Sequence, residues 1–207
     1  MGERTPLPEL DTADVAKDLA ADKVTFIDTR PNSEVHQGTV DRSLNVPAGK
    51  SVASYGAWVV NPEKDKNPLV LLAPDQEAAQ DMWDHLVRVG IDYVAGYLTT
   101  IDGLPTATPK LIQPEELDGF DAAMVLDVRN KTEHTAGHIP GSYQLSGGRA
   151  MWHLDELPAE GTIVTYCQSG VRNSVAASAL RRAGYDVVEL DGSYAGWSAW
   201  RNSVPVA

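Results

Sequence analysis

The chain has 207 residues, of which 43% are hydrophobic and 22% are charged, a composition typical of a globular protein with a core. Its 17 Lys and Arg against 29 Asp and Glu give a net charge of −12, which disfavours nucleic acid and anionic membrane surfaces as partners. No segment resembles a secretory signal or the roughly 18 apolar residues of a membrane span. The single cysteine, Cys167, excludes an internal disulfide and favours a reducing, cytoplasmic location.

The first predicted strand ends in an Asp-x-Arg pattern that occurs again later in the chain. Phe26–Arg30 recurs as Val125–Arg129, at an offset of 99 residues. An acid follows each Asp at the same distance, Glu34 in the first copy and Glu133 in the second. Such self-similarity predicts an internal repeat, which determines the architecture.

Further blocks of the repeat follow in chain order. Leu69–Ala73 corresponds to Ile163–Cys167 at an offset of 94, so the first copy contains five extra residues before this block. The segment Gly103–Pro109 is rich in turn-forming residues and is the predicted linker. We therefore predict two domains, residues 1–106 and residues 107–207.

Each copy alternates apolar strands with helices, a pattern typical of an α/β fold with a mainly parallel sheet flanked by helices. In the second copy, a helix is predicted over Val171–Ala183, with Gly184 as its terminator. Its N-terminus follows Cys167 closely. Parallel sheets bind ligands at the carboxyl ends of their strands, so this strand-to-helix loop is the candidate site.

The loop after Cys167 suits a nucleophile that carries negative charge. Backbone amides from Gln168 to Arg172, together with the helix N-terminus, favour a thiolate or persulfide on the sulfur. The planar guanidinium of Arg172 suits an oxyanion such as a sulfonate. The predicted catalytic residues are Cys167 and Arg172, and the predicted substrate-binding residues are Gln168, Ser169, Gly170 and Val171.

Four features together resemble the rhodanese family: the Asp-x-Arg strand, the segment Gly137–Ser142, the Cys-x4-Arg loop before a helix, and the segment Gly192–Trp197. The resemblance covers both copies and is stronger in the second. It implies two rhodanese-like domains and a sulfurtransferase that needs no cofactor or metal. Thiosulfate or a related small-molecule donor would load sulfane sulfur onto Cys167, and a thiol, sulfite or cyanide would remove it.

The interior of the loop leaves the donor open. Gln168 and Ser169 stand where animal thiosulfate enzymes have a basic pair, and mercaptopyruvate enzymes resemble only part of the loop. The short copies most resemble the tandem rhodanese repeats fused to metallo-β-lactamase-fold persulfide dioxygenases. This resemblance implies association with a persulfide-metabolising enzyme, either as a separate chain or as the C-terminal part of a longer one.

Two other functions remain as alternatives. Phosphatases and arsenate reductases with a related loop have five residues between Cys and Arg, whereas four separate Cys167 from Arg172. A non-catalytic module that senses persulfides or binds a partner is the second alternative. The first copy resembles such a module because Ala73 replaces the cysteine, Pro74 lacks an amide hydrogen, and Asp75 adds negative charge. We therefore predict that the first domain is inactive.

Other notable residues are given structural roles. Asp127 and Arg129 are expected to brace the turns around the site, and His138 is expected to be a turn residue. The five tryptophans are expected to lie in the core, with Trp152 as a candidate wall of the pocket.

Overall fold

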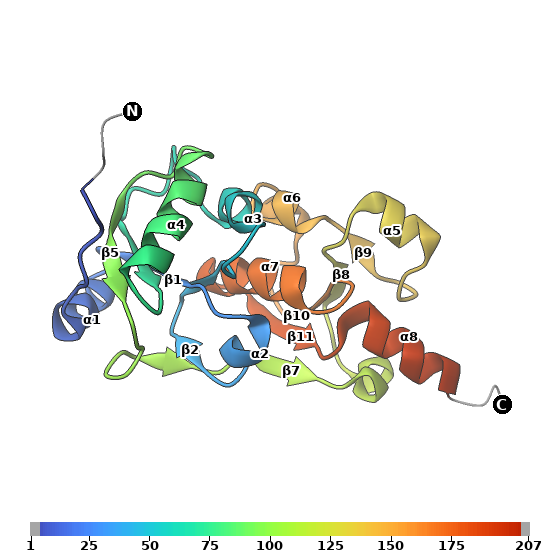
Figure 1. Cartoon of the computed structure of the whole chain (residues 1–207). Coiled ribbons are helices and arrows are strands. Elements are labelled where there is room, and N and C mark those ends of the chain that lie inside the picture. Colours follow the sequence, from blue (N-terminus) through green and yellow to red (C-terminus); the bar gives the residue numbers. More distant parts are fainter. Residues whose placement is uncertain (1–4, 204–207) are drawn as a thin grey trace. The chain divides into compact units, whose positions relative to one another are not determined.

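The computed structural model describes residues 5–203 and divides the chain into two compact units, one up to Thr108 and the other from Pro109 onward (Figure 1). The division falls just beyond the expected boundary. The short strand β6 (Thr106–Ala107) pairs antiparallel with β2 (Thr39–Val40) and so fastens part of the predicted linker to the first unit.

The first unit contains a four-stranded parallel sheet in the order β3-β1-β4-β5. Its strands are β1 (Thr25–Asp28), β3 (Leu44–Asn45), β4 (Leu69–Leu72) and β5 (Val94–Leu98). Its helices are α1 (Thr12–Ala20), α2 (Asn32–Val35), α3 (Val52–Val59) and α4 (Gln76–Val87). All residues of β1 and β4 are buried, because helices cover both faces of a parallel sheet.

The second unit contains a five-stranded parallel sheet in the order β7-β11-β10-β8-β9. Its strands are β7 (Lys110–Ile112), β8 (Met124–Asp127), β9 (Tyr143–Gln144), β10 (Thr162–Tyr166) and β11 (Asp186–Leu190). Its helices are α5 (Lys131–Ala136), α6 (Gly147–Ala150), α7 (Val171–Arg182) and α8 (Ser193–Ser203), with 3-10 turns at Pro114–Gly119 and Leu154–Glu156. The predicted α/β fold with parallel sheets and flanking helices is confirmed.

The two sheets share one strand order. Reading from β9, the second sheet runs β9-β8-β10-β11-β7, and the first runs β3-β1-β4-β5. In the first unit, a single parallel bridge from Glu9 to Tyr97 of β5 stands where β7 pairs with β11 in the second. The sequence offsets pair the same strands, β1 with β8 and β4 with β10.

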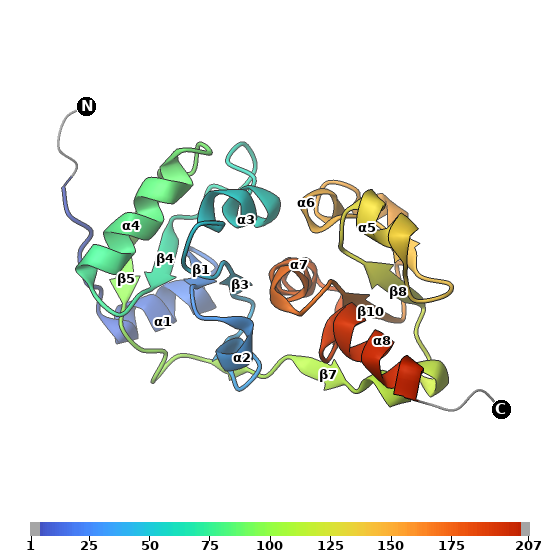
Figure 2. The same ribbon diagram turned by 45° about the vertical axis from the view of Figure 1, so that its right-hand side comes forward.

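Alternate residues of β10 and the cysteine that follows it face two apolar clusters in the second unit. Ile163 and Cys167 belong to a cluster with Leu180 of α7. Val164 and Tyr166 belong to a second cluster on the other face of the sheet. Figure 2 shows α7 and α8 beside β10. The predicted helix from Val171 is confirmed and ends one residue earlier than expected, at Arg182.

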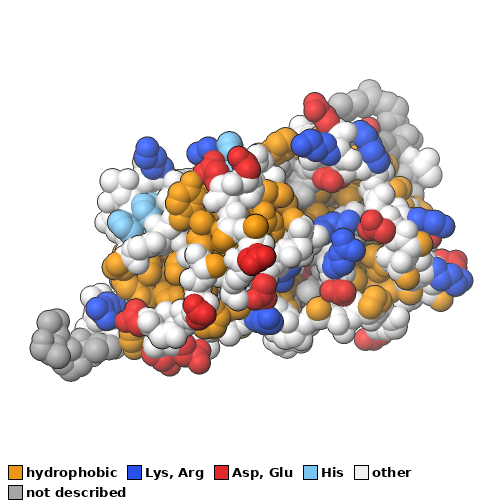
Figure 3. Space-filling model, turned by 180° about the vertical axis from the view of Figure 1, so that it is seen from behind, with side chains coloured by type: hydrophobic (Ala, Val, Ile, Leu, Met, Phe, Trp, Pro, Cys, Tyr) orange, Lys and Arg blue, Asp and Glu red, His pale blue; other side chains and the backbone are white. Residues whose placement is uncertain are grey.

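The face drawn in Figure 3 carries Lys and Arg side chains interspersed with Asp and Glu, and hydrophobic side chains lie between them. No helix within residues 5–203 is both long enough and apolar enough to cross a membrane.

Candidate active site around Cys167

Cys167 follows the last residue of β10 directly and is 1% exposed. The chain then turns through three residues, and α7 begins at Val171. The sulfur therefore lies at the carboxyl edge of a parallel sheet and close to a helix N-terminus, as the sequence predicts. Its neighbours in the apolar cluster include Leu126 and Ala176. Such burial leaves a reagent little room to reach the sulfur.

The backbone amide of Gly170 donates a hydrogen bond to Sγ of Cys167 at 3.1 Å. Gly170 has a φ of 104°, a conformation that side chains rarely adopt, so glycine permits the turn that aims this amide. An N–H donor stabilises a negatively charged sulfur more than a neutral one. The other amides from Gln168 to Arg172 are predicted to stabilise the outer sulfur of a persulfide, and this stays a prediction.

Ser193 at the start of α8 forms a second contact with the cysteine. Its Oγ accepts a hydrogen bond from the amide of Cys167 at 3.2 Å and lies 3.9 Å from Sγ, where it donates weakly. Ser193 is fully buried and has a φ of 53°. A non-glycine residue in this conformation stores strain, which the surrounding structure must hold. Ser193 lies in the segment Gly192–Trp197 that resembles the family pattern, but the sequence alone indicates no role for its side chain.

The first turn of α8 orients the loop through two further hydrogen bonds. The amide of Tyr194 donates to the carbonyl of Cys167, and that of Ala195 donates to the carbonyl of Gln168, both at 3.0 Å. In a trans peptide the carbonyl and the following N–H point in opposite directions. The amides of Gln168 and Ser169 therefore point away from α8.

Arg129 and Asp127 form a buried ion pair beside the loop. The Arg129 side chain is 2% exposed, and its Nη2 lies 2.7 Å from Oδ2 of Asp127. Nη2 also donates to the carbonyl of Gly137, and Nη1 lies 3.3 Å from Oε1 of Gln168. The guanidinium also stacks 4.1 Å from the ring centroid of Tyr194. Arg129 thus ties the Asp-x-Arg turn to the cysteine loop and to α8, in agreement with the expected bracing role.

The environment of this pair shifts two pKa values. Burial alone would raise the pKa of Asp127, but hydrogen bonds from Arg129 and His134 outweigh it and hold the pKa below its usual range. Burial raises the pKa of Tyr166 to about 12. The hydroxyl therefore stays neutral, and it braces the turn by accepting a hydrogen bond from the amide of Ile139.

Arg172 pairs with Glu133 from α5. Its Nη1 and Nη2 donate to the two carboxylate oxygens of Glu133 at 2.7 and 2.8 Å. Hydrogen bonds from Arg172 lower the pKa of Glu133 despite the opposing effect of partial burial. The guanidinium fork that the sequence assigns to an anionic donor therefore holds a carboxylate here. The repeat pattern marked Glu133, but its partner could not be identified from spacing alone.

The other predicted binding residues line the outer part of the loop. Gln168 and Ser169 are exposed, and Val171 is 37% exposed. Trp152 is 53% exposed, so the prediction that all the tryptophans lie in the core was wrong. It lies in a turn after the short helix α6. Among residues 5–203, no group of three or more His, Cys, Asp or Glu side chains is arranged to hold a metal ion.

The second unit defines a class of protein. It is a parallel α/β domain in which a cysteine stands at the end of a central strand and, after four intervening residues, an arginine lies on the following helix. Comparison with known proteins assigns this class to a family. The model of the family "Rhodanese-like domain" matches residues 112–199, which lie within the second unit.

Two curated relatives are named as sulfurtransferases. The thiosulfate sulfurtransferase GlpE of Pseudoalteromonas translucida is 32% identical over 90 residues, which cover 43% of this chain and 86% of the relative. A sulfurtransferase of Allochromatium vinosum is 29% identical over 93 residues, covering 44% of this chain and 85% of the relative. The chain belongs to the rhodanese family.

A solved structure extends over more of the chain. The thiosulfate sulfurtransferase of Pseudomonas aeruginosa aligns with 92% of this chain and 44% of its own, at 20% identity and a TM-score of 0.41.

Proposed function

We propose that this protein is a sulfurtransferase that carries sulfane sulfur as a persulfide on Cys167. The donor is thiosulfate or a related compound, and the acceptor is a thiol, sulfite or cyanide. The observation that carries the proposal is the hydrogen bond from the Gly170 amide to Sγ, at 3.1 Å, in the strand-to-helix loop of a rhodanese-family chain.

In the first step, the Cys167 thiolate attacks the outer sulfur of the donor. A new S–S bond forms to Sγ while the donor's S–S bond breaks, and with thiosulfate the leaving group is sulfite, which takes the electron pair. The Gly170 amide and the Ser193 hydroxyl stabilise the attacking thiolate. In the resulting persulfide the negative charge lies on the outer sulfur, which the other amides of the loop are predicted to stabilise.

In the second step, an acceptor nucleophile attacks the outer sulfur of the persulfide. The bond to Sγ breaks, its electron pair returns to Cys167 as thiolate, and the acceptor leaves with the sulfur. Because Cys167 is the only cysteine of the sequence, no second thiol of this chain can resolve the persulfide as a disulfide. The acceptor must therefore come from outside the chain, for example from an associated persulfide-metabolising enzyme.

We also propose that the first unit is a catalytically inactive rhodanese-like domain. Ala73 occupies the position of Cys167 in the repeat, directly after β4. Pro74 removes one backbone donor from the loop. The Asp75 carboxylate accepts a hydrogen bond from the Ala78 amide at 2.8 Å and thereby occupies part of the helix N-terminus that an anion would use.

The alternative is a rhodanese module that senses persulfides or binds a partner without turnover. The 1% exposure of Cys167 and the pairing of Arg172 with Glu133 favour it, because both restrict access of an anionic donor. A decisive test is to incubate the protein separately with thiosulfate, mercaptopyruvate and glutathione persulfide, and then to follow its mass.

The proposed activity predicts a gain of one sulfur atom with at least one donor and its loss when a thiol acceptor is added. The Cys167→Ser variant is the control and should gain none. A sulfur adduct that forms but is never released would favour the non-catalytic alternative.

A further inference from the structure

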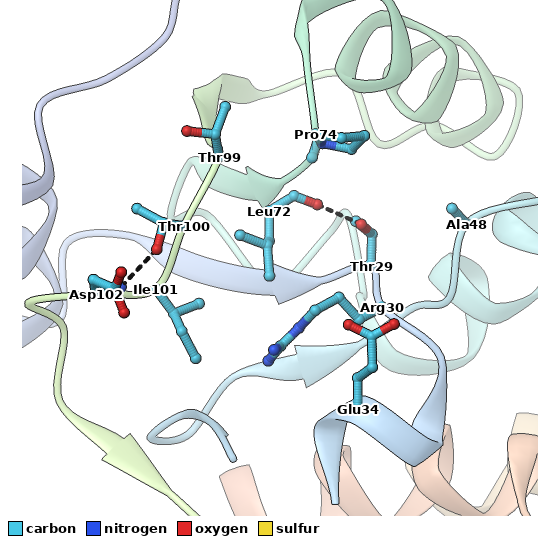
Figure 4. A pocket seen from close by; sticks show the side chains of 11 residues that line it. Thr29, Arg30, Glu34, Ala48, Leu72, Pro74, Thr99, Thr100, Ile101 and Asp102 are labelled. Atoms are coloured by element: carbon cyan, nitrogen blue, oxygen red, sulfur yellow. Dashed lines mark hydrogen bonds between the residues drawn. The ribbon is translucent and has the colours of Figure 1, made fainter. Parts of the chain in front are cut away.

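A pocket of about 570 Å³ lies in the first unit, at the carboxyl edge of its parallel sheet. Residues that follow β1, β3, β4 and β5 line it, together with α2 (Figure 4). Parallel sheets place their ligand sites at this edge. The volume falls within the range of about 300–1,000 Å³ that is typical of small-molecule sites. The pocket therefore has both the place and the size of a binding site.

The pocket has an apolar floor and two polar sides. Ala48, Leu72, Ala73, Pro74 and Ile101 supply the apolar surface. Figure 4 shows Arg30 and Glu34 on one side and the segment from Thr99 to Asp102 on the other. The Thr29 hydroxyl donates to the carbonyl of Leu72, so it is engaged within the wall. A ligand that fits would combine a short apolar stem with a charged end.

The charges around the pocket decide the sign of that end. The Arg30 guanidinium forms two hydrogen bonds with the Asp28 carboxylate, through Nε at 3.0 Å and Nη2 at 2.6 Å, and Nη2 also donates to the Gly38 carbonyl. Its positive charge is therefore balanced within the fold. Asp28, and to a smaller extent the nearby Glu34, raise the pKa of Arg30. Within residues 5–203, neither the Glu34 nor the Asp102 carboxylate forms a direct ion pair, and both residues are exposed. The pocket is therefore negative overall.

The repeat explains why Glu34 is left in this state. Its counterpart in the second unit, Glu133, accepts two hydrogen bonds from Arg172. At the offset of 94 that aligns Ala73 with Cys167, the counterpart of Arg172 is Ala78. The first unit thus retains the acid but has no arginine at the matching position. The same location that suits an anion in the second unit suits a cation in the first.

We propose that the pocket of the first unit binds a small organic cation, an ammonium or guanidinium group on a short aliphatic stem. The stem packs against Leu72, Pro74 and Ile101, while Glu34 and Asp102 hold the charged end from opposite sides. This site is separate from the sulfur chemistry of Cys167, so it stands or falls independently of the proposed function.

The test uses agmatine as the probe and the full chain labelled with nitrogen-15. Titration should give saturable shifts of the amide signals of Thr99–Asp102 and none of Gln168–Gly170. Glu34→Gln and Asp102→Asn should each weaken binding by about fivefold, the upper range for one exposed charge pair, and the double variant by about twentyfold. Raising the ionic strength should also weaken binding, because exposed charges are screened.

Glu63→Gln is the matched control, because Glu63 is an exposed acid of the same unit that does not line the pocket. It should leave agmatine affinity unchanged. Absence of saturable shifts at Thr99–Asp102, or equal weakening by Glu63→Gln, would overturn the proposal. Saturable binding of thiosulfate at Thr99–Asp102 would also overturn it.

The same chemistry could come from a free amine or from a basic side chain of a peptide. A second titration with an N-acetylated, C-amidated arginine tripeptide separates the two sources. Tighter binding of agmatine identifies a small-molecule site. Tighter binding of the peptide, with the same dependence on Glu34 and Asp102, identifies a site for an exposed arginine side chain.

Discussion

The two strand-to-helix loops show how one fold can either expose or occupy the amides of a helix N-terminus. At α4, the Asp75 carboxylate caps the helix by accepting a hydrogen bond from the Ala78 amide. At α7, Gly170 takes the capping position, no side chain within the described residues caps the helix, and the Gly170 amide instead donates to the cysteine sulfur. A helix end capped by its own acid has less capacity left for an anionic ligand.

The arginines of the two Asp-x-Arg turns also differ in their surroundings. The Arg129 side chain is 2% exposed and lies against Tyr194, whereas the Arg30 side chain is 25% exposed and lines an open pocket. The second unit has closed this region around the loop, while the first has left it open. In the first unit, an alanine after the central strand and an open pocket at the same sheet edge therefore occur together.

The largest expected effect comes from moving the nucleophile between the loops. Cys167→Ser should reduce sulfur transfer to background, since the hydroxyl forms no persulfide. Adding Ala73→Cys to this variant should not restore transfer, because Pro74 lacks a donor and Asp75 already caps α4. Steady-state sulfur-transfer assays measure the activity of both variants, and protein mass shows whether either one gains sulfur. Recovery of turnover by Ala73→Cys would show that a position at the carboxyl edge of the parallel sheet is enough to activate a cysteine.

The next largest effect concerns the two buried acids. Arg129→Met should lower the free energy of unfolding of the second unit by roughly 3–5 kcal/mol, because it leaves Asp127 buried without its cation. Arg30→Met should cost the first unit less, roughly 1.5–3 kcal/mol, since that pair is partly solvated. Urea unfolding of each variant gives the two values. Equal costs would mean that the difference in burial has no energetic consequence.

Ser193 permits a smaller and more specific test. Ser193→Ala removes the hydroxyl and keeps the positive φ, so it should destabilise the second unit by about 1–2 kcal/mol. Ser193→Gly also removes the hydroxyl but relieves strain of roughly 1 kcal/mol, and it should be the more stable variant. Both should slow alkylation of Cys167 by iodoacetamide about two- to fivefold. If the alkylation rates of the two variants instead differ in proportion to their stabilities, Ser193 has only a structural role.

The smallest effect is the pH dependence of the Glu133–Arg172 pair. The pKa of folded Glu133 lies below its unfolded value of about 4.3, so the pair stabilises the fold above that pH, and its contribution disappears as pH falls through the lowered pKa. Glu133→Gln should therefore cost at most about 1 kcal/mol at neutral pH and nothing in strong acid. Urea midpoints across pH measure this.

Glu34→Gln is the control for that experiment, because Glu34 has no ion pair among the described residues and its substitution should leave stability nearly unchanged at either pH. The same Glu133→Gln variant sharpens the functional question. If Arg172 binds an anionic donor, a neutral partner should release it and lower KM for thiosulfate more than it changes kcat. An unchanged KM would show that Arg172 does not bind the donor.

Sequence alone predicted the parts of the molecule that local patterns specify. The apolar runs became β1, β4, β8 and β10, and the helix after Cys167 began at the expected residue, Val171. The linker was only partly predicted, because the pairing of β6 with β2 joins segments far apart in the chain. A two-residue strand of exposed Thr106 and Ala107 carries no pattern of its own.

In the candidate site, too, local sequence patterns predicted the local features but not the contacts between distant segments. The position of Cys167 and the turn at Gly170 follow from strand, glycine and helix in sequence. The contacts of Ser193 with Cys167 and of Arg172 with Glu133 join residues 26 and 39 positions apart, and only the packed fold brings them together. The predicted internal repeat offered one usable signal, since Arg172 accompanies Glu133 whereas Ala78 accompanies Glu34 at the matching positions.

The hydrogen bonds from the first turn of α8 to the carbonyls of Cys167 and Gln168 link the sulfur to the dynamics of another helix. Local opening of α8 would break both bonds and release the peptide planes that direct the loop amides. Amide hydrogen exchange at Tyr194 and Ala195 would report the free energy of that opening. A bulky reagent would reach the buried sulfur through the same opening. The rate of that reaction and the rate of amide exchange should therefore change in parallel when α8 is weakened.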